Sequence, residues 1–131
     1  MNPNHALVRD LYAAFAAGDL PRLLSRFDAR VVWNEAEGFP LADRTPYVGA
    51  DAIVHGVFAR LVEEWDAFEV RVGELAGDGD VVTMFGRYHA RHRRTGRVLD
   101  VQCAHTWWLA DGKIVRFQQM VDTAAVAAAV N

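Results

Sequence analysis

Cysteine is almost absent from this chain of 131 residues, which contains only Cys103. A lone cysteine excludes an internal disulfide framework and a cysteine-based zinc site. His55, His89 and His92 show no metal-ligand spacing, since His89 and His92 fall on opposite faces of one predicted strand. We therefore expect no bound metal.

Long apolar runs are also missing. No run reaches the roughly 18 residues that a transmembrane helix needs. The N-terminal sequence MNPNHALVRD lacks the basic and then apolar layout of a secretory signal. These absences predict a soluble, cytoplasmic protein without a membrane partner.

Positive charge is not in excess, because the net charge is −3. Binding to phosphate backbones needs concentrated Lys and Arg, so a nucleic-acid partner is not expected. The one basic stretch, RHRRTGR at 91–97, contains a Thr-Gly step that is typical of a solvated hairpin tip. No glycine-rich phosphate loop or nucleophile elbow occurs, and we predict no cofactor.

The first half of the chain has helical periodicity. Leu7, Leu11 and Phe15 form the stripe of an amphipathic helix. Asp19 and Pro21 favour the start of a second, shorter helix. A strand is predicted at 30–35 and a third helix at about 50–64. The intervening segment, 36–49, is long for a compact domain, and such loops tend to form lids and pocket rims.

After Trp65 the apolar period changes from 3.6 to 2, which predicts strands. Asp-Gly at 111–112 and Thr-Gly at 95–96 separate apolar runs at 81–92, 98–110 and 113–121, a pattern typical of hairpins. Helices followed by an antiparallel meander predict an α+β fold, with the helices on one face of the sheet. With 52% hydrophobic residues, the whole chain, 1–131, is expected to form one domain.

Two-residue turns at both hairpins would set the register of the sheet. His105 would then lie opposite Gln118, and Val101 opposite Asp122. One largely apolar face would carry the polar side chains of Tyr88, His105, Gln118 and Asp122, which is the makeup of a ligand pocket.

The other face of the sheet would carry Trp108 and Phe117 among polar groups. No predicted helix covers this face. A partly apolar, uncovered sheet face favours a homodimer formed through it.

Four segments carry a family resemblance: AAFAAGDLPRLLSRF, VVWNEAEGFP, PYVGADAI and AHTWWLADGKIVRFQQMVDT. In their order and spacing they resemble the SnoaL-like, ketosteroid-isomerase-related group of the nuclear transport factor 2-like superfamily. The resemblance implies a cone of three helices on a curved sheet, followed by a short C-terminal helix, and usually a homodimer. It also implies acid/base enzymes without metal or cofactor, among them polyketide cyclases, steroid isomerases and epoxide hydrolases. Other members only bind ligands or act as scaffolds.

Asp122 matches the acidic general acid/base of the cyclases in this group. It also directly precedes the helical sequence TAAVAAAV, where Asp is a leading N-cap residue. Thr123 could cap that helix instead. Our hypothesis is that Asp122 is catalytic, and helix capping is the alternative.

His105 falls in a strand where the cyclases carry polar cavity groups. It could serve as acid, base or oxyanion donor, or it could be a core histidine that is satisfied by Gln118. Tyr12 is shifted from the position of the tyrosine of the steroid isomerases, and Glu35 is the best second carboxylate if two are needed.

The remaining candidates are expected to line the pocket or its rim. The predicted ligand-binding residues are Gln118, Tyr88, Trp33, Glu35, Trp107, Met120, Tyr47 and Phe58. The predicted function is acid/base chemistry on a small apolar carbonyl or polycyclic compound. The alternative is a non-catalytic small-ligand-binding domain of the same fold.

Overall fold

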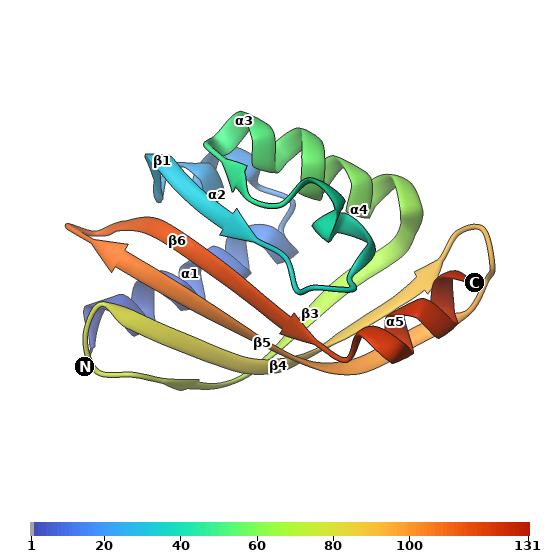
Figure 1. Ribbon diagram of the computed structural model, residues 1–131. Helices are drawn as coiled ribbons and strands as arrows, with labels where there is room; N and C mark the ends of the chain where they lie inside the picture. Colours follow the sequence, from blue (N-terminus) through green and yellow to red (C-terminus); the bar gives the residue numbers. More distant parts are fainter. Residues whose placement is uncertain (1) are drawn as a thin grey trace.

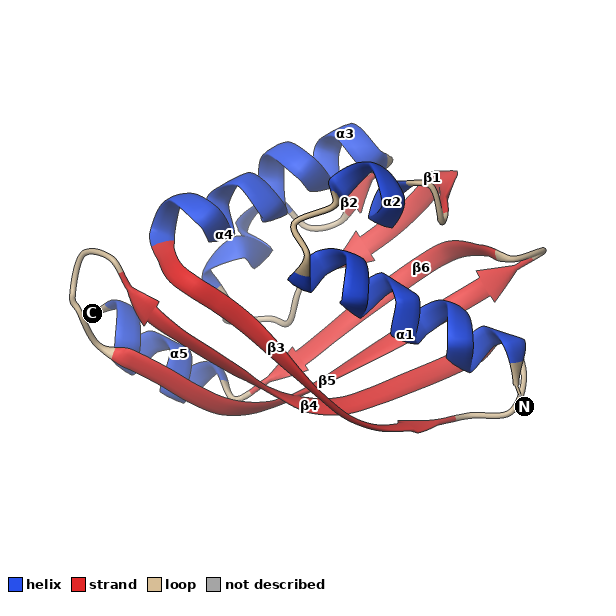
Figure 2. Cartoon of the chain, turned by 180° about the vertical axis from the view of Figure 1, so that it is seen from behind, coloured by secondary structure: helices blue, strands red, loops and turns tan. Residues whose placement is uncertain are grey.

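The computed structural model describes residues 2–131 as a curved six-stranded sheet with helices on one face (Figures 1 and 2). The strand order is β2-β1-β6-β5-β4-β3, and only the β1–β6 pair is parallel. The strands are β1 (Phe27–Asn34), β2 (Tyr47–Val48), β3 (Trp65–Ala76), β4 (Val81–His92), β5 (Val98–Ala110) and β6 (Lys113–Val121). The sheet does not close, and its concave face holds the core.

Two helices begin the chain, as predicted. α1 (Pro3–Ala16) has Asn2 as its N-cap, and its apolar side, including Leu7, Val8 and Leu11, is buried against the sheet. α2 (Leu20–Leu24) begins after Asp19, whose side chain accepts a hydrogen bond from the Arg22 N–H. This cap satisfies one of the free backbone donors of the first turn.

The third predicted helix contains a π-helical turn. α3 (Ala50–Ile53) leads into η2 (Val54–Phe58), which continues as α4 (Ala59–Glu64). Gly56 is required in η2, because a Cβ there would lie 2.2 Å from the Tyr47 ring. The wider π turn therefore packs directly against the residue that begins β2.

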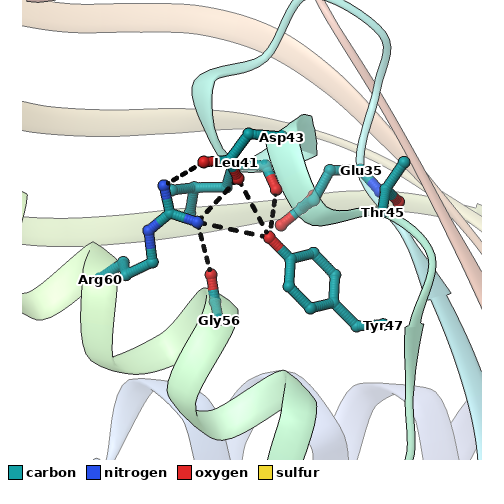
Figure 3. A network of polar contacts seen from close by, with 7 residues as sticks. All are labelled: Glu35, Leu41, Asp43, Thr45, Tyr47, Gly56 and Arg60. Atoms are coloured by element: carbon teal, nitrogen blue, oxygen red, sulfur yellow. Dashed lines mark hydrogen bonds and ion pairs between the residues drawn. The ribbon is translucent and has the colours of Figure 1, made fainter.

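The long connection between β1 and β2 is tied to this helix (Figure 3). It contains the 3-10 turn η1 (Pro40–Arg44). Arg60 donates to both carboxylate oxygens of Asp43, at 2.8 and 2.9 Å, and to the Gly56 carbonyl at 3.3 Å. The Tyr47 hydroxyl donates to the Leu41 carbonyl. The segment predicted as a rim is thus fastened at several points.

The predicted hairpin strands at 81–92, 98–110 and 113–121 are confirmed. The predicted register between the last two is wrong beyond the first pairs of the hairpin. Ala110 pairs with Lys113 and Leu109 with Ile114, but a bulge then shifts the ladder so that Trp108 pairs with Arg116. Because side chains alternate across a sheet, this one-residue shift exchanges the faces of every later β6 residue.

The C-terminal helix α5 (Thr123–Val130) lies beyond the end of β6, near the β4–β5 hairpin (Figure 1). The basic hairpin tip is not simply solvated. Arg97 donates to the Ala128 carbonyl at 2.8 Å, and Thr95 to the Ala129 carbonyl at 2.6 Å. Arg94 donates to the Val130 carbonyl. These donors satisfy carbonyls that a helix C-terminus leaves free.

Within residues 2–131, no helix is long and apolar enough to cross a membrane.

Candidate functional site

A small apolar cavity lies between the concave face of the sheet and the helices. Its volume is about 50 Å³, enough for only a few water molecules. Aromatic and aliphatic side chains form most of its wall, and the polar atoms come from a few buried groups. The lining residues relevant to the site are Tyr12, Trp33, Glu35, Phe58, Tyr88, His105, Trp107 and Gln119.

Three of these polar residues form a linear array with His105 at its centre. The Tyr12 hydroxyl lies 2.7 Å from His105 Nδ1, and the Tyr88 hydroxyl contacts His105 Nε2. Tyr12 comes from α1, Tyr88 from β4 and His105 from β5. The array therefore joins a helix to two strands across the cavity.

Each tyrosine oxygen also accepts a hydrogen bond from a fixed N–H donor. Trp107 Nε1 donates to Tyr12 at 2.9 Å, and Gln119 Nε2 donates to Tyr88 at 2.9 Å. Gln119 is itself oriented, because its side-chain oxygen accepts from the Ala36 N–H at 3.1 Å. These donors hold both hydroxyl groups in place.

Burial lowers the pKa of His105 to about 3, so the imidazole is neutral at physiological pH. Burial also raises the pKa of Tyr12 and Tyr88 well above its usual range. A neutral imidazole has one N–H, yet two tyrosine hydroxyls contact its two nitrogens. One tyrosine must donate to the ring and the other must accept from it. The accepting tyrosine keeps a free O–H for a ligand.

Glu35 directly follows β1 and is the buried carboxyl of the cavity, with 5% of its surface exposed. Burial raises its pKa from 4.5 to about 7, although the nearby Trp33 indole acts in the opposite direction. That indole is not at hydrogen-bonding geometry, since Trp33 Nε1 and Glu35 Oε2 both lack a partner among the described residues. A buried, unsatisfied carboxyl oxygen is costly and suits a group that meets a ligand.

Six predicted residues line the cavity together. They are His105, Tyr88, Trp33, Glu35, Trp107 and Phe58. Trp33 stacks on Phe117, with ring centroids 3.7 Å apart, so these aromatic residues form a continuous wall. Their chemical roles stay predictions.

Gln118, Met120 and Asp122 do not reach the cavity, and their predicted placement on its face is wrong. The β6 bulge turns this set toward the opposite face, where Met120 is 59% exposed. Gln119, not Gln118, pairs with His105 in the ladder.

Asp122 is exposed and caps α5. Its Oδ1 accepts from the Ala124 N–H at 3.1 Å and from the Ala125 N–H at 3.2 Å. Asp122 is thus the N-cap of α5, as in the alternative interpretation of this residue. The expectation that Thr123 caps the helix in its place is wrong.

Tyr47 is buried, but it packs against Gly56 and does not line the cavity. Its hydroxyl is engaged by the loop network, so its predicted ligand contact is not supported by its position.

Tyr12 and Gln119 were missed as site residues. Tyr12 carried a usable signal, because it lies one residue from Leu11 on the apolar side of a predicted amphipathic helix. Gln119 carried none, since the bulge that turns it inward has no marker in the hairpin sequence. No cluster of three metal-ligating side chains occurs in residues 2–131.

A curved sheet with helices on its concave side and a small cavity between them is the nuclear transport factor 2-like fold. The chain belongs to the SnoaL-like domain family, whose model matches residues 8–117. A search of curated proteins gave no match.

Solved structures agree with this assignment. An NTF2-like protein from Burkholderia thailandensis is 40% identical, with 96% of this chain and 95% of that chain covered and a TM-score of 0.91. TerC, co-crystallised with polyporic acid, is 25% identical, with 98% of both chains covered and a TM-score of 0.88. A putative SnoaL-like polyketide cyclase from Jannaschia is 20% identical, with coverage of 97% and 90% and a TM-score of 0.84.

Proposed function

We propose that this protein is a cofactor-independent acid/base enzyme that acts on a small apolar carbonyl compound. The observation that carries the proposal is the buried carboxyl of Glu35, whose pKa is raised to about 7, in the same apolar cavity as the Tyr12–His105–Tyr88 array. Glu35 replaces Asp122 as the proposed proton-transfer group.

In the proposed reaction, ionised Glu35 removes a proton from the carbon next to the carbonyl. The carbonyl oxygen gains negative charge as the enolate forms, and the free tyrosine O–H donates a hydrogen bond to it. With an unsaturated ketone the enolate is conjugated, and protonated Glu35 returns the proton to its far carbon, which moves the double bond and gives the isomer. If the enolate carbon instead forms a bond to a second carbonyl carbon, protonated Glu35 gives its proton to the resulting alkoxide, which completes an aldol addition.

The properties of Glu35 suit this task. A general base works best when its pKa lies near the working pH, because both the ionised form and a strong proton affinity are then available. Burial supplies this match, since it disfavours the charged carboxylate. Burial is the main cause of the raised pKa of Tyr88, with smaller contributions from Cys103 and Glu35. Glu35 and Tyr88 both line the cavity.

His105 acts as a positioning residue in this proposal. A ring with a pKa of about 3 does not exchange protons readily at neutral pH. Its neutral state is nevertheless what leaves one tyrosine O–H free. His105 therefore sets which hydroxyl faces the ligand.

One observation favours the second candidate, a non-catalytic ligand-binding domain. The polar array is well satisfied within the protein, with His105, Trp107 and Gln119 all engaged. In that case a bound ligand would raise the melting temperature but would never be converted. TerC supports a small organic ligand in either case.

Deuterium exchange tests the proposal directly. A panel of ketones, each with at least one hydrogen on the carbon next to the carbonyl, is incubated with the protein in D₂O, and deuterium incorporation at that carbon is followed by NMR. The enzyme proposal is supported if the wild type exchanges a ketone and Glu35→Gln still binds that ketone but no longer exchanges it. Binding of the panel without any exchange supports the non-catalytic alternative.

We also propose a homodimer through the outer face of the sheet. Phe85 and Met120 on this face are 49% and 59% exposed, and Arg116 stacks over Trp108 at 4.3 Å. Exposed apolar groups on an uncovered sheet face favour pairing with a second copy. Light scattering at micromolar concentration should give twice the chain mass, and Phe85→Glu should give a monomer. A monomeric wild type contradicts the dimer.

A further inference from the structure

An open groove of about 530 Å³ adjoins the cavity. It lies between the end of α1, the start of α2, the η2–α4 segment and the start of β3. The groove and the cavity share part of their walls. The shared residues are Phe15, Leu23, Phe58, Leu61 and Phe68.

All five shared residues are apolar, so the partition between the two spaces is made of apolar side chains. Phe15 and Phe58 form its central pair, with ring centroids 6.0 Å apart and an interplanar angle of 56°. Phe58 is buried, whereas Phe15 is only partly buried. Of this pair, Phe15 is thus the side chain nearer to solvent and the freer to rotate.

The π turn η2 places Phe58 on this boundary. Val57 lines the cavity, Val54 lines the groove, and Phe58 lines both. The backbone there is held by the Gly56–Tyr47 contact and by Arg60 (Figure 3). π-helical turns occur frequently at functional sites. An opening between the groove and the cavity would therefore depend on side-chain rotation around a fixed backbone.

The cavity alone is too small for the proposed substrates. Small-molecule sites usually measure about 300–1,000 Å³, whereas this cavity measures about 50 Å³. We propose that the ligand has two parts: a compact carbonyl head, bound in the cavity, and an apolar tail, bound in the groove beyond Phe15 and Phe58. This inference rests on the proposed function for its carbonyl head.

The groove favours an uncharged tail. Arg93, at its margin, donates to the Val62 carbonyl at 3.1 Å and lies 3.9 Å from Asp66. Asp19 is occupied as the cap of α2. The charged groups at the margin are thus already engaged, and the wall between them is largely apolar.

A pair of matched ketones tests the inference. Binding of 2-butanone and 2-undecanone is measured by calorimetry for the wild type, Ala59→Phe and Ala13→Phe. Ala59 is exposed and lines the groove but not the cavity. Ala13 is exposed on α1, lines neither space, and is the control for the same substitution.

The wild type and Ala13→Phe should bind 2-undecanone at least about 100-fold more tightly, since each buried methylene contributes up to about fourfold. Ala59→Phe should reduce this preference to under about tenfold without weakening 2-butanone, because it fills only the tail site. Equal affinity of the wild type for the two ketones would overturn the proposal that the groove binds the tail. An unchanged preference for 2-undecanone in Ala59→Phe would also overturn it.

Deuterium exchange of the bound ketones separates this inference from the proposed function. Suppose that Ala59→Phe abolishes the preference for 2-undecanone but the wild type exchanges neither ketone. That result supports the tail site in the groove and overturns the proposal of an acid/base enzyme. If neither ketone binds, both proposals are overturned.

Discussion

Glu35 follows β1 and Asp122 follows β6, two neighbouring strands that run in parallel. Glu35 is buried, lacks a partner for Oε2, and has its pKa raised to about 7. Asp122 is exposed and accepts two backbone N–H bonds from the helix that it caps. Two carboxyl groups at the ends of adjacent strands therefore have different physical roles.

The difference arises from the direction of each side chain and from the segment that succeeds each strand. Glu35 continues the inward alternation of Val31 and Trp33, and the fastened loop then covers it. Asp122 comes after a bulge that turns its side of β6 outward, and a helix begins immediately after it. Position at a strand end is a weak guide to chemistry when the local register is unknown.

The largest expected effect separates the two carboxyl groups by activity. Glu35→Gln should lower the rate of deuterium exchange at the carbon next to the carbonyl about 10²–10⁴-fold, because it removes the proposed proton-transfer group. Asp122→Asn makes the same carboxylate-to-amide change at the cap and should leave the rate unchanged, since Asn caps equally well. Exchange rates measured by NMR for both variants check this. The reverse pattern would favour Asp122 as the proton-transfer group.

The two tyrosines should compensate for one another. Tyr12→Phe and Tyr88→Phe each leave one hydroxyl, and the imidazole tautomer that donates to this hydroxyl frees its O–H for the ligand. The double variant has no donor and should lose about 10²–10³-fold in kcat. Each single variant should lose much less. If one single variant loses as much activity as the double variant and the other single variant loses little, only one of the two hydroxyls is used.

Stability should depend on pH through Glu35. The pKa of Glu35 is raised in the folded state, so its favourable contribution is complete below pH 4.5 and is lost as the pH rises through about 7. Between pH 4.5 and about 7, the unfolding free energy of the wild type should fall by roughly 3 kcal/mol relative to that of Glu35→Gln. Urea unfolding at several pH values measures this difference, and parallel curves for the two proteins would contradict it.

The smallest effect belongs to the cap. Asp122→Ala should cost about 1 kcal/mol of unfolding free energy, because two N–H groups of α5 lose their acceptor. The exchange rate should not change. Thermal unfolding and exchange measured on the same sample test both statements, and a loss of activity at full stability would contradict them.

Most of the fold was predictable because periodicity and turn residues are local signals. The three hairpin strands and the amphipathic α1 follow from them directly. The bulge beside Leu109 depends on how two strands pack, and it reversed the predicted faces of Phe117, Gln118 and Asp122, so that Phe117 is buried in the cavity wall and not on the outer face. His105 and Tyr88 were placed correctly, because the β4–β5 ladder shifted by an even number of residues.

Glu35 was predicted as a ligand-binding residue and as a second carboxyl, but not as the main proton-transfer group, because its burial depends on contacts that are not local in the sequence. Its N–H donates to the Thr45 hydroxyl at 3.3 Å, and the next N–H, of Ala36, donates to Gln119 at 3.1 Å. No local pattern in the sequence marks these contacts. The raised pKa of Glu35 follows from its burial. Tertiary packing, not residue type, therefore distinguishes the buried carboxyl of Glu35 from the capping carboxylate of Asp122.

The most direct test of this account is a carbon-13 NMR titration of the side-chain carboxyl groups in the folded protein. We expect a midpoint near pH 7 for Glu35. A Glu35 midpoint at the ordinary value of 4.5 would show a solvated carboxyl and contradict its role as the neutral-pH base.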